Sequence, residues 1–335
     1  MNNKPYTTIA DAIEEGFKYI SKRSRGEESS LLTPFTTLNR LFVEGLPWSS
    51  HLVIGARSGV GKTLIKDQLL NAAFDPKINP NLNVKVLDFS LEMPLQATGL
   101  RLIQGVTKID KSTLLSTYGN KIPQSSLDLI EKMIRNRRKQ PWSIETSPST
   151  VDELRERILQ EINRWSNEKD AKIIVALDHS LLVKGNKGDK EGDVIAKYSE
   201  MITNLRSNYG ITVITLSQLN RNIEDGHRKI PGRADNYPQT SDISSSDKLL
   251  HHCDFMFILN RPSDFNLKFY GPEKFIVPNH NNYVALHVVK NRSGEHKMIH
   301  LNANYANYVF EEMAEPPESN ELGEITKKQN PFKKK

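Results

Sequence analysis

The chain has 335 residues, of which 37% are hydrophobic and 26% charged, and its net charge is +6. Its length fits two domains or one large α/β domain, its composition excludes a wholly disordered chain, and its basic charge favours a polyanionic partner. One cysteine excludes an internal disulfide framework and a four-cysteine zinc site, and without a long apolar stretch or a signal peptide's apolar core we expect a soluble, intracellular protein.

The first 30 residues are expected to form a separate segment. Apolar residues at helical spacing predict an amphipathic helix over residues 8–22, which Thr8 and Asp11 can cap. A polar stretch over residues 24–30 follows. The apolar face can pack on the chain's own domain or dock on a neighbouring subunit, and the pattern leaves both open. The apolar positions are Ile9, Ile13, Phe17 and Ile20.

From residue 31 onward, short apolar runs alternate with amphipathic segments. This alternation predicts an α/β fold with a mostly parallel, covered sheet, whose final strands form an antiparallel hairpin at its edge. The expected strands cover residues 51–54, 84–89, 141–145, 173–177, 211–216, 255–259 and 284–289. The expected helices cover residues 63–74, 94–105, 126–139, 150–165 and 193–209, and Thr150 with Glu153 gives the fourth of them a capping box.

The C-terminal segment changes character from about residue 311. It is acidic at first and ends in a cluster of lysines. This composition predicts a disordered tail over residues 313–335. Its lysines either contact nucleic acid or are only solvated.

The strongest motif is a phosphate-binding loop, Gly55-Ala-Arg-Ser-Gly-Val-Gly-Lys-Thr63, between an expected strand and an expected helix. Backbone amides and a helix N-terminus suit a β-phosphate, Lys62 suits the β- and γ-phosphates, and Thr63 suits Mg²⁺. The strict spacing has glycine where Ala56 stands, and its methyl group is tolerated if φ is negative. We predict ATP or another NTP as the ligand of Arg57, Ser58, Gly59, Val60, Gly61, Lys62 and Thr63.

Three polar residues at strand ends complete the predicted nucleotide site. Asp178 ends the apolar run 173–177 and can hold Mg²⁺ through water. Glu92, just past the strand 84–89, can orient a water for hydrolysis, or it can cap a helix. Gln218 ends its strand and can sense the γ-phosphate, or it can be an ordinary polar strand end.

In combination, these motifs resemble the RecA-like motor domain of DnaB-type replicative DNA helicases. The resemblance covers residues 31–312 and adds the late motif Lys290-Asn-Arg-Ser-Gly294 to Phe89-Ser-Leu-Glu-Met93 and Ser217-Gln-Leu-Asn-Arg221. It implies a RecA-like P-loop NTPase fold and a ring, usually a hexamer, that hydrolyses NTP between subunits and translocates 5′ to 3′ on single-stranded DNA. It also divides the chain into a docking helix at 1–30, a motor domain at 31–312 and a tail at 313–335.

The resemblance assigns roles to the site residues. It makes Glu92 the catalytic base, Asp178 the Mg²⁺ carboxylate and Gln218 the γ-phosphate sensor. Arg292, with Lys290 beside it, becomes an arginine finger that reaches the neighbouring subunit's nucleotide. An exposed basic hairpin is the alternative for these two residues. The helix at 8–22 matches the family's linker helix, which docks on the adjacent subunit.

The chain departs from the family pattern in three places. The family's N-terminal domain is not expected, so primase, a helicase loader and other replisome proteins stay open as partners. His179 follows the acidic strand where the family usually has Tyr-Leu-Gln. Ser244-Ser-Ser-Asp247 stands where the family typically has a DNA-contacting Arg-Glu-Ser-Gly stretch.

Two long loops are expected to face the ring's centre and grip the DNA backbone, with solvated loops as the alternative. The first is basic and glycine-rich, at 184–190, and the second covers 222–247. The candidate contacts are Lys184, Lys187, Lys190, Arg228, Lys229, Arg233 and Lys248. The neighbouring His251, His252 and Cys253 make a poor tetrahedral metal site, so Cys253 is expected to be a buried core residue.

Together these observations predict an ATP-dependent, ring-forming DNA helicase in the cytoplasm of a bacterial or virus-infected bacterial cell. One alternative is a recombinase or recombination mediator of the same fold, although such proteins commonly have lysines where Arg292 stands. Another is a non-catalytic nucleotide-dependent module, which the presence of Lys62, Thr63, Asp178 and Glu92 disfavours.

Overall fold

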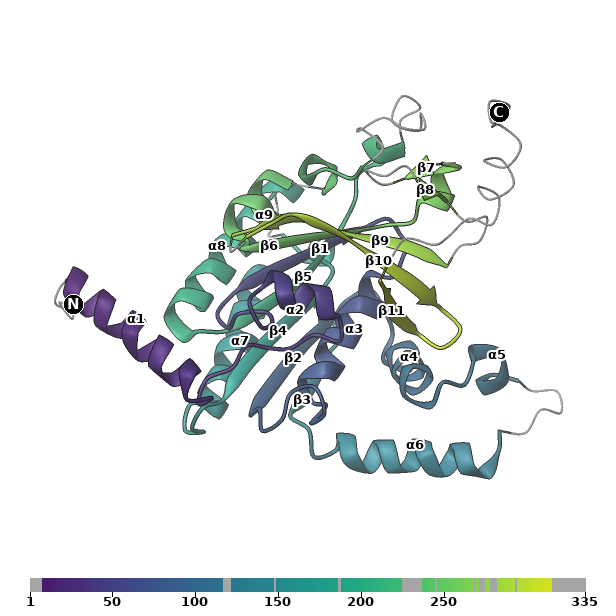
Figure 1. Cartoon of the computed structure of the whole chain (residues 1–335), viewed down its shortest axis with the longest axis horizontal. Coiled ribbons are helices and arrows are strands. Elements are labelled where there is room, and N and C mark those ends of the chain that lie inside the picture. The colour runs from purple at the N-terminus through teal and green to yellow at the C-terminus, as the bar shows by residue number, and fades with distance from the viewer. Residues whose placement is uncertain are drawn as a thin grey trace, which may run out of the picture.

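A mostly parallel sheet forms the centre of the molecule, as predicted. The computed structural model describes residues 8–116, 122–147, 149–185, 188–224, 237–244, 246–267, 269–270, 275–277, 282–292 and 294–314. Within these residues, nine strands form one sheet in the order β11-β10-β9-β6-β1-β5-β4-β2-β3 (Figure 1). The strands from β3 to β6 in this order pair in parallel, and β9, β10 and β11 add antiparallel at the edge.

The bounds of the strands match the apolar runs of the sequence closely. The sheet contains β1 (His51–Ala56), β2 (Val84–Ser90), β3 (Trp142–Glu145), β4 (Lys172–Asp178), β5 (Thr212–Gln218), β6 (Phe255–Asn260), β9 (Tyr283–Asn291), β10 (Lys297–Asn304) and β11 (Val309–Met313). A separate small ribbon pairs β7 (Phe269–Tyr270) with β8 (Phe275–Ile276). All six residues of β1 are buried, because helices cover the sheet on both faces.

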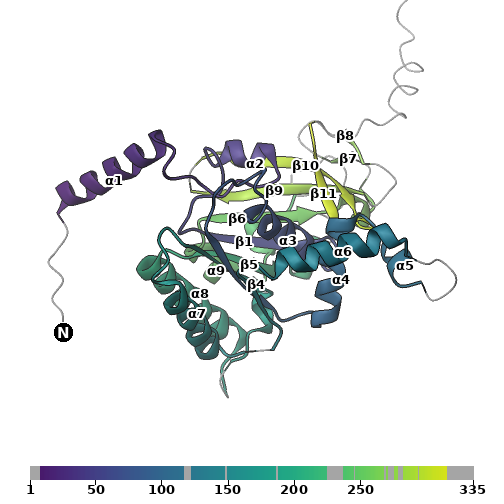
Figure 2. The same ribbon diagram turned by 90° about the horizontal axis from the view of Figure 1, so that it is seen from below.

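Helices cover both faces of the sheet, and further helices extend away from it (Figures 1 and 2). They are α1 (Ile9–Ser24), α2 (Thr36–Leu41), α3 (Lys62–Ala73), α4 (Leu95–Thr107), α5 (Lys111–Leu114), α6 (Gln124–Arg137), α7 (Val151–Trp165), α8 (Glu191–Tyr209) and α9 (Ser246–His252). One hydrophobic cluster joins the sheet to α7, α8 and α9, and a second joins the other face to α2 and α3. Successive side chains of β1 point to opposite faces of the sheet, so Val53 belongs to the first cluster, whereas Leu52 and Ile54 belong to the second.

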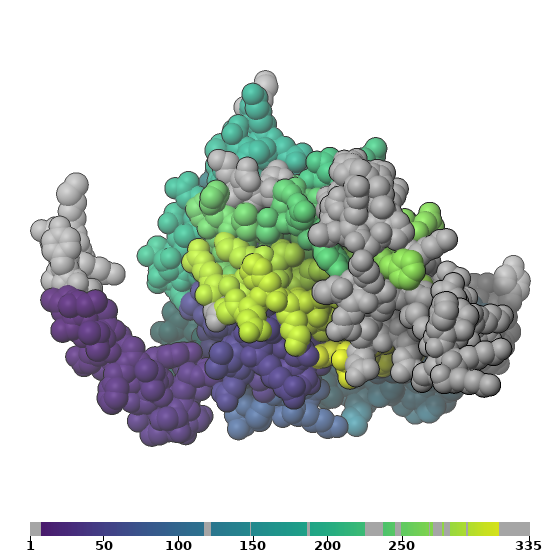
Figure 3. Space-filling view, turned by 45° about the horizontal axis from the view of Figure 1, so that its top comes forward, coloured from purple at the N-terminus to yellow at the C-terminus, as the bar shows by residue number. Residues whose placement is uncertain are grey.

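Helix α1 stands away from the rest of the chain (Figures 1 and 3). The predicted capping box is present, since the Asp11 amide donates to Thr8 Oγ1 (3.2 Å) and the Thr8 amide donates to Asp11 Oδ2 (2.8 Å). None of its residues is buried, and Ile9 and Phe17 are 79% and 67% exposed. Within the described residues, no helix is long and apolar enough to cross a membrane.

Strand β11 extends into the segment expected to be acidic and disordered. Backbone pairing of His300 with Met313 and of Asn302 with Glu311 keeps this stretch in the sheet. The Thr37 amide also donates to the Glu312 carboxylate (3.1 Å). The chain therefore remains part of the sheet to the end of β11, although Glu311 and Glu312 are charged. The rest of the predicted tail, from residue 315, lies outside the described residues.

Candidate active site

The phosphate-binding loop connects β1 to α3, as predicted. Ala56 is the last residue of β1, so its methyl group sits on extended backbone and causes no strain. The loop turns at Gly59 and Gly61, whose φ angles are +81° and +119°. A Cβ atom at Gly61 would come within 2.6 Å of the Phe310 ring, so both the backbone angle and the space require glycine there.

Helix α3 presents its N-terminus to the loop. Its N-cap is Gly61, so no side chain occupies the first backbone amides of the helix. Lys62 begins the helix and is only 9% exposed. Burial lowers the pKa of Lys62, although the Glu92 and Asp178 carboxylates act in the opposite direction. The ammonium group is therefore partly shielded from water, near two carboxylates and beside the glycine-rich loop, which suits a phosphate chain.

Asp178 lies opposite Thr63. The Thr63 hydroxyl donates to Asp178 Oδ2 (2.7 Å), although the two residues are 115 positions apart in the sequence. Asp178 is fully buried, and within the described residues its Oδ1 has no hydrogen-bond partner. A hydroxyl oxygen beside a carboxylate oxygen with spare capacity is a donor set that Mg²⁺ accepts. The residues present therefore fit the predicted metal.

Glu92 and Gln218 lie at the same edge of the sheet as the loop. The backbone register pairs Ser90 with Asp178 and Ala56 with Gln218, so all these strands end together. The Glu92 side chain is 44% exposed, and its Oε2 lies 4.0 Å from His179 Nε2. The structure thus brings Lys62, Thr63, Glu92, Asp178 and Gln218 to one place.

Lys290 and Arg292 lie at the opposite edge of the sheet, where the parallel strands β1 and β6 begin. Asn291 between them pairs with Phe255, which in turn pairs with Leu52 near the start of β1. The length of β1 therefore separates them from the loop, a distance of roughly 20 Å. The structure does not bring these two residues to the phosphate loop of the same chain.

Asp254 holds Arg292 at this edge. Arg292 Nη1 lies 3.1 Å from Asp254 Oδ1, and the guanidinium side chain is 53% exposed. The same carboxylate accepts the His51 amide (2.8 Å) and pairs with Arg206. Lys290 Nζ donates to the Leu250 carbonyl. The Arg292 guanidinium is therefore held by Asp254 through one nitrogen, while about half of the side chain stays exposed to solvent.

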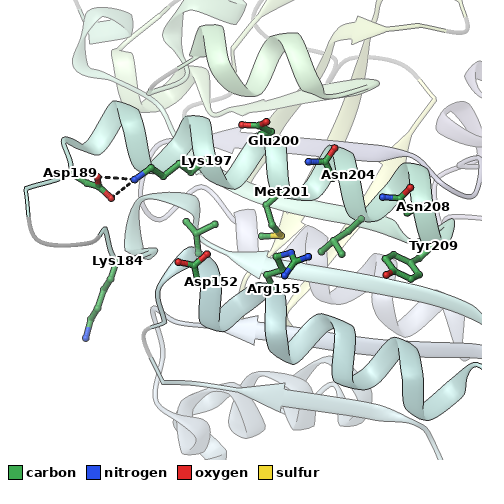
Figure 4. A pocket seen from close by; sticks show the side chains of 12 residues that line it. Asp152, Arg155, Lys184, Asp189, Lys197, Glu200, Met201, Asn204, Asn208 and Tyr209 are labelled. Carbon is green, nitrogen blue, oxygen red and sulfur yellow. Dashed lines mark hydrogen bonds and ion pairs between the residues drawn. The ribbon is translucent and has the colours of Figure 1, made fainter. Parts of the chain in front are cut away.

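The predicted DNA-contacting residues are only partly described. Lys184 and Lys190 are exposed on the loop after β4. Figure 4 shows Lys184 at the end of a groove of about 530 Å³ between α7 and α8, pointing away from the ion pair of Lys197 and Asp189. Lys248 lies in α9. Lys187, Arg228, Lys229 and Arg233 lie outside the described residues.

Several contacts of the loop and of α3 were not predicted from the sequence. The Tyr305 hydroxyl donates to the Val60 carbonyl (3.0 Å), and the Gln68 side chain makes two hydrogen bonds with the Phe310 backbone (2.8 and 3.0 Å). The hairpin of β10 and β11 thus supports the loop from outside. About 245 residues separate these partners, and no local pattern links them.

Arg57 connects the loop to the segment that follows β5. Its Nη1 donates to the Leu219 carbonyl (3.1 Å), and it forms an ion pair with Glu224 in the short 3₁₀ helix Arg221–Glu224. Gln218 lies directly before this segment. The Arg57 side chain therefore links the phosphate-binding loop to the start of the second predicted DNA-contacting loop.

A buried ion network lies beneath α3. Lys66 is fully buried, 2.7 Å from Asp88 and 3.1 Å from Asp67, whose other oxygen accepts the Tyr308 hydroxyl (2.9 Å). Burial alone would lower the pKa of Lys66, but the carboxylates of Asp67, Asp88 and Asp178 together raise it. Lys66 therefore stays charged and fixes the helix that carries Lys62 and Thr63, two of the predicted phosphate-site residues.

His252, next to Cys253, makes an ordinary polar contact. His252 Nδ1 lies 3.0 Å from the Thr203 hydroxyl. Cys253 is fully buried, as predicted, and burial raises the pKa of its thiol to about 11.

Comparison with known proteins gives consistent matches. The family model of the DnaB-like helicase C-terminal domain matches residues 30–312. Replicative DNA helicases DnaB from Helicobacter pylori (strain ATCC 700392 / 26695) and Geobacillus stearothermophilus are 26% and 28% identical over 262 and 243 residues, covering 76% and 72% of this chain and 49% of each relative. The chain thus spans about half the length of the curated relatives it matches.

Two solved structures show the same fold. An ATPase domain of known structure superposes with a TM-score of 0.74 at 20% identity, covering 91% of this chain and 99% of that one. A DnaB-like replicative helicase, studied with its interactions with primase, gives 0.69 at 19% identity and covers 92% and 68%. With a family model that matches most of its length, the chain belongs to the family of the DnaB-like helicase C-terminal domain.

Proposed function

We propose that this chain is the motor of a ring-forming replicative DNA helicase, which hydrolyses ATP or another NTP and moves along single-stranded DNA. One observation carries the proposal: the phosphate loop and Arg292 lie at opposite edges of one sheet. A complete hydrolytic site then needs the loop of one subunit and the arginine of the next. Repeating such a head-to-tail contact closes into a ring or winds into a helix.

The residues around the loop would divide the work of hydrolysis. The amides of residues 57–63 and the Lys62 ammonium would hold the phosphates, and Thr63 with Asp178 would hold Mg²⁺. Mg²⁺, when bound, supplies positive charge to the phosphate oxygens. Glu92 would orient the attacking water and accept its proton.

Gln218 and Arg57 would pass the state of the nucleotide to the DNA side. Gln218 would contact the γ-phosphate, and the segment after it is tied to the phosphate loop through Arg57 and Glu224. This segment leads into residues 225–236, which contain three of the proposed DNA contacts. The proposed contacts are Lys184, Lys187, Lys190, Arg228, Lys229, Arg233 and Lys248, and movement 5′ to 3′ follows the family resemblance.

Assembly would use α1 as a docking helix for the neighbouring subunit. Its apolar face is unpartnered within the described residues. A groove of about 630 Å³ between α3, α4 and α6 offers a matching surface, with Val106, Leu129 and Met133 in its lining. The same groove carries Lys132 and Arg137, which complement the acidic residues in the first half of α1.

Phe17→Asp is expected to weaken this assembly, because it places a carboxylate in the middle of the apolar face. Losing the burial of one phenylalanine costs about 1.5–3 kcal/mol per contact, so subunit association should weaken roughly tenfold or more. Light scattering across a concentration series measures it. Lys22→Asp adds the same carboxylate on the polar face and should leave assembly unchanged. Equal behaviour of the two variants would contradict docking through the apolar face.

Wild-type activity tests the function as a whole. Hydrolysis should rise when single-stranded DNA is added, and a forked duplex should be unwound only with hydrolysable nucleotide. Electron microscopy should show rings. Hydrolysis that ignores DNA, or filaments without unwinding, would instead support the recombinase alternative, which the family match does not favour.

We propose primase as a partner, whereas a helicase loader and other replisome proteins follow only from the family resemblance. The support is one structural neighbour, the DnaB-like replicative helicase whose structure was studied together with its interactions with primase.

A further inference from the structure

His179 lies beside the carboxylate that we assign to water activation. It follows Asp178 at the end of β4, where the register pairs Ser90 with Asp178 and the Leu91 amide donates to the Asp178 carbonyl (2.8 Å). These backbone contacts hold the residues that follow β2 and β4 side by side. As a result, His179 Nε2 lies 4.0 Å from Glu92 Oε2.

The two side chains differ in freedom. The His179 side chain is 11% exposed and the Glu92 side chain 44%. The imidazole is therefore the fixed partner and the carboxylate the movable one. A contact between them would restrict the carboxylate and leave the ring where it is.

The ring has unused hydrogen-bonding capacity. Within the described residues, its buried Nδ1 has no partner. A neutral imidazole donates from one nitrogen and accepts at the other. Donation from Nε2 toward Glu92 leaves Nδ1 as an acceptor for water in the site.

We propose that His179 is a positioning residue for Glu92, whose carboxylate it holds toward the attacking water through a hydrogen bond from Nε2–H. The inference rests on the proposed function, in which Glu92 is the base. Hydrogen bonds of this kind are often long without substrate and tighten in the reactive complex.

A matched pair of amides tests the role of each ring nitrogen. His179→Gln places an amide nitrogen near the position of Nε2, whereas His179→Asn places it near Nδ1. Gln should keep kcat of DNA-stimulated hydrolysis within about threefold of wild type, and Asn and Leu should lower it about tenfold, as loss of one hydrogen bond to a charged group predicts. KM and the Kd of a fluorescent ATP analogue should not change.

A second background separates positioning from a general structural effect. In Glu92→Gln, single-turnover hydrolysis should not fall further when His179→Asn is added, because the group it positions is gone. Equal rates for Asn and Gln, or an additive loss in the Glu92→Gln background, would overturn the inference while leaving the proposed function intact. Full activity of Glu92→Gln alone would overturn the assignment of Glu92 as the base and this inference with it, whereas only wild-type hydrolysis that ignores single-stranded DNA would overturn the proposed function. If the His179→Leu variant does not fold, the comparison of His179→Gln with His179→Asn still tests the inference.

Discussion

Arg292→Ala is expected to lower DNA-stimulated hydrolysis about 10³-fold or more, the range that arginine fingers supply in phosphoryl transfer. The physical reason is loss of positive charge next to the transferring phosphate. Within one chain the residue is roughly 20 Å from the phosphate loop, so the effect must pass through the neighbour. The variant should still bind nucleotide, because the loop, Lys62 and Thr63 are untouched.

Rings that mix two inactive variants test whether the site is shared between subunits. Lys62→Ala subunits retain the arginine, and Arg292→Ala subunits retain the phosphate loop. Each pure variant should be inactive. In an equal mixture, about half of the subunits have an intact loop, and about half of their neighbours supply an intact arginine. About a quarter of the sites in a head-to-tail ring should therefore be active. Arg164→Ala, an exposed arginine on α7, is the control and should have no effect. A mixture no more active than the pure variants would exclude a shared site.

Glu92→Gln is expected to lower kcat for hydrolysis by about 10²–10⁴-fold, the usual contribution of a positioned general base. The amide has the same shape as the carboxylate but cannot accept the proton of the attacking water. Nucleotide affinity should stay within a fewfold of wild type, whereas Lys62→Ala should lose it. Stopped-flow binding of a fluorescent ATP analogue and a phosphate-release assay separate the two effects.

The control for this substitution is Glu156→Gln, on the exposed face of α7. It removes the same charge far from the loop and should change neither rate nor affinity. If Glu92→Gln kept more than about a tenth of the wild-type kcat, another group would have to activate the water, and Glu92 would serve only as part of the segment before α4.

The central sheet could be predicted from the sequence because its strands are buried on both faces. The run at 173–177 is continuously apolar, and the structure extends it by only one residue at each end. Helix α2 was not predicted, because six residues are too few to show a helical period. The two-residue strands β7 and β8 were missed for the same reason.

The part of the candidate site that is formed by residues at the ends of parallel strands could be predicted from the sequence. Asp178 and Gln218 each end a parallel strand, and such strands share one edge, so their proximity to the loop follows from topology. The support from Tyr305 and the contact of Glu92 with His179 did not follow, since they depend on long-range packing and on side-chain placement. The edge that carries Arg292 depends on the register of β9 with β6, which no local pattern encodes.

The contact of Phe310 with Gly61 matters for anyone who shortens this protein. The ring fills the space beside the loop, and Gln68 fastens the same residue to α3 by two hydrogen bonds. A fragment that stopped before β11 would keep the whole nucleotide motif in its sequence and yet lose one wall of the pocket. The smallest useful piece therefore has to reach the end of β11 at Met313, beyond Arg292, the last residue with a proposed role in the chemistry.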